Sequence, residues 1–139
     1  MKTGRLFLAV VFFFGAIFTS FAQVDTKPQE EKVSADKVEV YYFHYERRCA
    51  TCIAVEEETE KALNELFPGQ MKSGEMTFLS VNLEEESNEP LAERLKADGQ
   101  TLLIVKGDKR EDLTNNAFMN ARTNPDKLKK AIKKAIDKL

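Results

Sequence analysis

The two cysteines of the chain stand two residues apart, in the motif Cys49-Ala50-Thr51-Cys52, and the sequence changes character at this motif. Residues 38–45 are mostly β-branched or aromatic, which predicts a strand buried on both faces for most of its length. From about 49 to 67, apolar residues recur at three- and four-residue steps, as on an amphipathic helix. The motif therefore lies where a central strand ends and a helix begins.

Two thiols at this spacing on the first turn of a helix can close a small disulfide ring with little backbone movement. The first, Cys49, lies where unpaired backbone N–H groups and the helix dipole favour a thiolate. Arg47 and Arg48 add positive charge on the same side and are expected to favour the thiolate further. We therefore expect Cys49 to be the attacking sulfur of a redox pair and Cys52 the resolving one.

The rest of the chain predicts a series of shorter elements. Apolar periodicity, turn residues and helix caps mark their positions. Pro68-Gly69 ends the first helix, a loop follows at 71–75, and a strand at 76–83 lies nearer a sheet edge. Next comes a short helix begun by Ser87 or Asn88 and ended by Asp98-Gly99. A hairpin of strands at 101–105 and about 110–113, a loop at 114–123, and a closing helix from Asn124-Pro125 complete the chain.

This order predicts an α/β fold, β-α-β-α-β-β-α, with a mixed sheet of about four strands and helices on both faces. The helical crossover makes the first two strands parallel, and the hairpin makes the last two antiparallel. With the CxxC motif at the first strand-to-helix junction, residues 38–139 resemble the thioredoxin fold. The sequence looks like one of the small exported thioredoxin-like proteins of bacteria.

The resemblance implies thiol-disulfide exchange at Cys49 and Cys52, with protein thiols or disulfides as partners and no cofactor besides the redox-active disulfide. Three positions depart from the family's pattern. Gln100 stands near the place where a cis-proline normally faces the cysteines. Phe43 stands where thioredoxins often bury a carboxylate, and Arg48 stands where they usually have Trp. The interior of the motif, Ala50-Thr51, also differs from the Gly-Pro usual in thioredoxins. Because of this interior and Arg48, the redox potential of the family does not transfer to this chain.

The N-terminus predicts export. Lys2 and Arg5 precede an apolar run over residues 6–18 that is too short to span a membrane, and small residues precede a cleavage site after Ala22. We expect a signal peptide at 1–22, a flexible linker at 23–37, and a domain at 38–139. The mature protein would be periplasmic or secreted, in an oxidising compartment. Only the chain before cleavage would meet the membrane, through its signal segment; the alternative is an uncleaved N-terminal anchor.

Charge argues against nucleic acid as a partner. Cleavage removes two basic and no acidic residues, which leaves 19 basic and 23 acidic residues and a net charge of −4. We expect a monomer whose substrates are proteins, with a membrane electron donor as a further candidate partner.

Two other functions use the same residues. His44, the only histidine, could join Cys49 and Cys52 in a copper or zinc site. Alternatively, the domain binds a partner without turnover, or the disulfide is inert. An exchange enzyme loses activity in Cys49→Ser and traps partners in Cys52→Ser, a metal carrier loses affinity in His44→Ala, and a binding module tolerates all three changes.

Overall fold

The structure, a computed structural model, describes residues 36–139. The expected signal peptide, its cleavage site after Ala22, and residues 23–35 of the expected linker lie outside this range. Within the range, no helix is both long and apolar enough to cross a bilayer.

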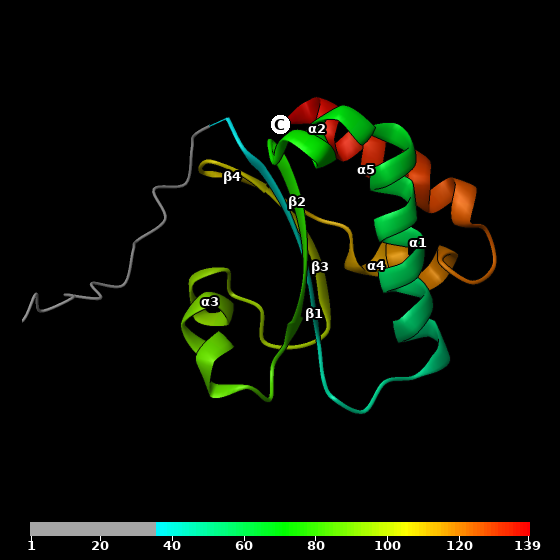
Figure 1. Cartoon of the computed structure of the whole chain (residues 1–139). Coiled ribbons are helices and arrows are strands. Elements are labelled where there is room, and N and C mark those ends of the chain that lie inside the picture. The colour runs from blue at the N-terminus through cyan, green and yellow to red at the C-terminus, as the bar shows by residue number, and fades with distance from the viewer. Residues whose placement is uncertain (1–35) are drawn as a thin grey trace, which may run out of the picture. The chain divides into compact units, whose positions relative to one another are not determined.

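A four-stranded sheet forms the centre of the domain, in the order β2-β1-β3-β4. Strand β1 (Val38–His44) pairs in parallel with β2 (Met76–Asn82) and antiparallel with β3 (Thr101–Lys106). Strand β4 (Lys109–Asp112) completes the hairpin with β3. The predicted mixed sheet, the central place of the first strand and the edge position of the second are confirmed (Figure 1).

Strand β1 is buried on both faces because helices cover both sides of the sheet. Val40 and Tyr42 point toward the larger core, whereas Tyr41 and Phe43 point toward the smaller one. Side chains alternate between the faces of a strand, so one apolar run serves both cores. The larger core is covered by α1 (Ala50–Leu66), α4 (Thr114–Asn120) and α5 (Pro125–Lys138), and the smaller one by α3 (Glu89–Arg94) (Figure 1).

The closing helix α5 packs on α1 through the apolar stripe that the sequence predicted. Leu128 and Ile132 of α5 and Leu63 of α1 are fully buried in the larger core. The predicted cap is also present, since the Asn124 side-chain oxygen accepts a hydrogen bond from the Lys127 N–H at 3.2 Å. This pairing satisfies one of the free N–H groups of the first turn.

Two predicted loops are helices, so those predictions were wrong. Residues 68–73 form α2 (Pro68–Ser73), because Pro68 occupies a first-turn position that needs no N–H, and Gly74 then ends the helix with φ +80°. Within the predicted loop 114–123, residues 114–120 form α4. Its Ala117 is fully buried in the larger core, and this packing outweighs the poor helix propensity of three asparagines.

The predicted end of the helix at Asp98-Gly99 was also wrong. A 3-10 turn (Glu86–Asn88) leads into α3, whose C-cap is Leu95. Lys96 takes the left-handed conformation with φ +51°, and the Ala97 N–H donates to the Ala92 carbonyl at 2.8 Å. The burial of Ala97 fixes this Schellman-type ending, although a lysine takes the place that usually holds glycine.

Candidate active site

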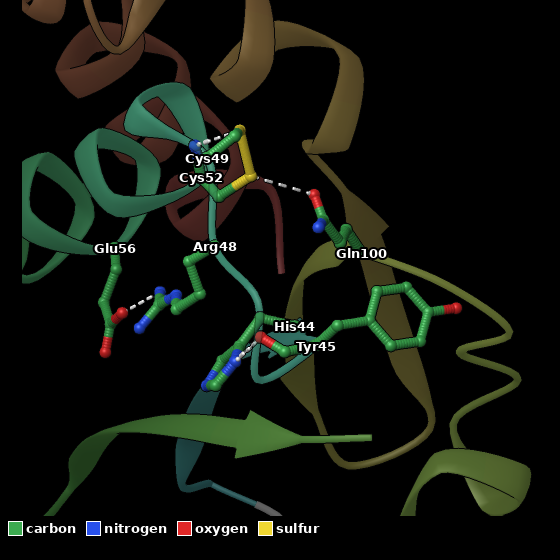
Figure 2. A network of polar contacts seen from close by, with 7 residues as sticks. All are labelled: His44, Tyr45, Arg48, Cys49, Cys52, Glu56 and Gln100. Atoms are coloured by element: carbon green, nitrogen blue, oxygen red, sulfur yellow. Dashed lines mark hydrogen bonds and ion pairs between the residues drawn. A yellow bond between two sulfur atoms is a disulfide. The ribbon is translucent and has the colours of Figure 1, made fainter. Parts of the chain in front are cut away.

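The two cysteines form a disulfide at the start of α1, with their Cα atoms 5.0 Å apart. Cys49 is the N-cap of the helix, and its extended backbone lets the side chain turn back over the first turn. The Cys52 N–H donates to the Cys49 Sγ at 3.1 Å (Figure 2). One of the unpaired N–H groups of the helix start is therefore directed at the sulfur of Cys49, as the motif's place in the sequence predicted.

The two cysteines differ in their exposure to solvent. Cys49 is exposed, whereas Cys52 is only 2% exposed and packs at the inner side of the turn. A bulky disulfide can approach Cys49 but not Cys52. In addition, the N–H directed at Cys49 and the positive end of the α1 dipole favour negative charge on the outer sulfur. This asymmetry is the one that a nucleophile and its resolving partner require.

Gln100 lies beside the inner sulfur. Its Oε1 atom is 3.3 Å from the Cys52 Sγ (Figure 2). The sheet brings these residues together, because the antiparallel register pairs Phe43, near the end of β1, with Thr101, at the start of β3. The sequence analysis expected Gln100 near the cysteines, and in the structure its side chain contacts Cys52. No peptide bond within residues 36–139 is cis.

The segment between β1 and the motif is anchored to the segment that follows β2. The Leu83 N–H donates to the His44 carbonyl at 2.8 Å, and the Glu46 N–H donates to Glu84 Oε2 at 2.5 Å. The first bond continues the parallel pairing of β1 and β2 one residue beyond the end of β2, and the second ties the loop after β1 to a side chain of the segment after β2. The backbone leading into Cys49 is thereby held at the end of the sheet.

Arg48 turns toward α1 and away from the disulfide (Figure 2). Its guanidinium forms an ion pair with Glu56, and its Cζ atom lies 5.7 Å from the centre of the Tyr42 ring. Part of the positive charge that the sequence analysis assigned to the cysteine pair is therefore compensated by a carboxylate. Arg47 is exposed on the loop before the motif.

Glu56 is the residue of this site that sequence reasoning missed. Partial burial favours its neutral form, but hydrogen bonds from Ser80 and Arg48 and the charge of Arg48 outweigh burial, so the pKa of Glu56 lies below its usual range. Burial raises the pKa of Tyr42, and Arg48 partly opposes that rise. The available signal was helical spacing, since Glu56 follows Cys52 by four residues and so lies on the same side of α1.

His44 takes part in a local contact. Its Nδ1–H donates to the Tyr45 carbonyl at 2.9 Å, and its ring lies 5.9 Å from that of Tyr42. In the part of the chain that the structure describes, no three His, Cys, Asp or Glu side chains are grouped so that they could hold a metal ion. The structure thus brings Cys49, Cys52 and Gln100 together, but does not gather His44 with the two cysteines into such a group.

The topology identifies the fold. Strand β1 is parallel to β2 and antiparallel to β3, helices cover both faces, and the CxxC motif lies at the junction of β1 and α1. The fold is thioredoxin-like. Phe43, for which the sequence analysis expected the place of a carboxylate often buried in thioredoxins, has no exposed surface.

The chain was compared with protein families, curated proteins and solved structures. No protein-family model matches the sequence, and no curated protein matches it significantly. A solved structure of a malarial protein is similar to this chain, with 22% identity, a TM-score of 0.45, and coverage of 71% of this chain and 97% of that one.

Two solved thioredoxins are similar as well. The germline-specific thioredoxin Deadhead of Drosophila melanogaster has 20% identity and a TM-score of 0.48, and the match covers 71% of this chain and 81% of that one. The thioredoxin of Wuchereria bancrofti has 16% identity and a TM-score of 0.41, with coverage of 74% and 85%. At these identities the likeness concerns the fold alone.

Proposed function

We propose that this chain is an exported thiol-disulfide oxidoreductase whose redox pair is Cys49 and Cys52. The observation that carries the proposal is the asymmetry of the pair at the helix start. Cys49 is exposed and its sulfur accepts the Cys52 N–H, whereas Cys52 is buried beside Gln100. An inert structural disulfide has no need of this arrangement, and a ring this small contributes little by restricting the unfolded chain.

The exchange proceeds in two displacements. The Cys49 thiolate attacks one sulfur of a substrate disulfide, which forms a mixed disulfide and releases the other substrate sulfur as a thiolate that takes up a proton. Cys52 then loses its proton to solvent or to the leaving sulfur and attacks Cys49. The Cys49–Cys52 disulfide forms and the second substrate thiol leaves. Two electrons pass from the protein to the substrate, and the reverse sequence oxidises a substrate dithiol. No cofactor takes part.

The signal-like N-terminus supports the exported part of the proposal. Cleavage after Ala22 would deliver a mature protein beginning at Gln23 to the bacterial periplasm or the medium, where a disulfide can persist. Its substrates there are protein thiols or disulfides, and a membrane electron donor would be needed if it acts as a reductant. N-terminal sequencing of the protein from a periplasmic extract tests this part. A chain that still begins at Met1 would contradict it.

The redox proposal is tested by equilibration in glutathione buffers of graded ratio, followed by thiol alkylation and mass measurement. We expect a reversible, two-electron transition between dithiol and disulfide at one defined potential, and its value separates an oxidant from a reductant. Cys49→Ser should abolish exchange, and Cys52→Ser should accumulate mixed disulfides. A pair that stays oxidised at every ratio, or that binds copper or zinc with loss of affinity in His44→Ala, would refute the proposal.

A further inference from the structure

Gln100 makes a side-chain contact with the inner cysteine that the exchange steps above do not use. Its Oε1 atom lies 3.3 Å from the Cys52 Sγ, across 48 residues of sequence, and Cys52 is almost wholly shielded from water. In the disulfide that the structure contains, this sulfur carries no hydrogen. The carbonyl oxygen is a hydrogen-bond acceptor only, so in the oxidised state it has no donor at Cys52.

We propose that Gln100 is a positioning residue that holds Cys52 as a neutral thiol in the dithiol form. On reduction the Cys52 sulfur gains a hydrogen, and an acceptor already stands at hydrogen-bond distance. The Cys52 S–H then donates to Gln100 Oε1, while the Cys52 N–H remains directed at the Cys49 sulfur. The inference rests on the proposed function, because it concerns the reduced form of the same pair.

The two hydrogen bonds assign opposite charge states to the two sulfurs. A hydrogen bond from an N–H favours a thiolate at Cys49, whereas a carbonyl acceptor favours the protonated form of Cys52. Negative charge is thus directed to the exposed sulfur, where a substrate can be attacked. Since the S–H···O bond exists only after reduction, Gln100 also stabilises the dithiol form relative to the disulfide.

The size of the effect follows from the kind of bond. A thiol is a weak donor, and a neutral intramolecular hydrogen bond contributes little net stability, so we expect about a threefold change in an equilibrium constant. Proline at this position could not make the contact, because it has no side-chain acceptor.

The test compares unfolding of the oxidised and reduced protein in urea, for wild type and Gln100→Leu, which removes the acceptor. We expect the unfolding constant of the reduced protein to rise about threefold more than that of the oxidised protein. By the thermodynamic cycle, the dithiol–disulfide equilibrium with glutathione should move toward the disulfide by the same factor. Gln100→Met, which keeps an unbranched chain but no carbonyl, should behave in the same way.

Gln70 provides the matched control, because it is an exposed glutamine on α2. Gln70→Leu should change both redox forms equally. If the Gln100 variants changed the unfolding constants of the oxidised and reduced proteins equally, the inference would be overturned, because a loss of packing alone affects both redox forms. A larger loss in the oxidised form would also overturn it, because the amide would then donate its N–H to the sulfur. The unfolding comparison needs no exchange activity, so it decides the role of Gln100 even if the glutathione titration refutes the proposed function.

Discussion

The ion pair between Arg48 and Glu56 should be energetically coupled, because it lies at the base of the site and is mostly shielded. Each side chain is only 22% exposed, and Arg48 also lies over the Tyr42 ring. Exposed pairs contribute about 0.2–1 kcal/mol, and breaking a fully buried pair costs about 3–5 kcal/mol. For this intermediate burial we expect Arg48→Met and Glu56→Gln each to lower the free energy of unfolding by about 2 kcal/mol.

The double variant, Arg48→Met with Glu56→Gln, measures the interaction between the two side chains apart from their contacts with other residues. Removing both charges leaves no unpaired ion, so we expect it to cost about 3 kcal/mol in total, which corresponds to a coupling energy of about 1 kcal/mol. The assay is urea unfolding of the oxidised protein at pH 7, followed by far-UV circular dichroism. Lys133 and Asp137 on α5 are the control pair, since their side chains are 53% and 54% exposed and their coupling should be about 0.5 kcal/mol or less. Strict additivity of the Arg48 and Glu56 variants would refute the reasoning.

Three further predictions concern pH, capping and the core. The pKa of Glu56 is lowered in the folded state, so its carboxylate contributes stability above about pH 4.5, and this contribution is lost as the pH falls through the folded-state pKa. The difference in unfolding free energy between wild type and Glu56→Gln should therefore shrink from pH 7 to pH 3. A constant difference would contradict the assignment. Asn124→Ala should cost about 1 kcal/mol of unfolding free energy, measured in urea, because the Lys127 N–H loses its acceptor, and an unchanged midpoint would show that the cap contributes nothing. Ile132→Ala should cost about 2–5 kcal/mol by the same assay, whereas Lys134→Ala on the exposed face of α5 should cost about 0.5 kcal/mol or less; equal losses would be inconsistent with the packing described.

Local sequence patterns determined the strand-to-helix junction that carries the Cys49–Cys52 disulfide. Three elements are specified within a few residues by their local patterns: β1 by its apolar run, α1 by its helical periodicity, and α5 by its capping residue and first-turn proline. At these elements the apolar period, the capping residues and the pattern of burial all indicate the same structure. The CxxC motif lies inside this well-specified stretch. Its placement at the helix start, and the α/β order of the whole domain, were therefore predictable.

Long-range packing decided the elements whose local signals are weak. Helix α4 contains three asparagines and forms because Ala117 is buried in the larger core, and α3 ends early because Ala97 is buried with Lys96 left-handed. Helix propensity contributes less free energy than the burial of an apolar side chain, so burial decides where these helices form and end. Local sequence patterns do not show which of these residues the folded core will bury.

The polar contacts of the site also depended on the tertiary structure. Helical spacing alone did not reveal that Arg48 turns to Glu56, because an exposed arginine and a charged helix face are ordinary features of a solvated surface. The sequence indicated that Gln100 lies near the cysteines, but the antiparallel register of β1 and β3 brought its side-chain amide to Cys52. Such contacts join residues far apart in the chain, and only the packing of the sheet fixes their distance and direction.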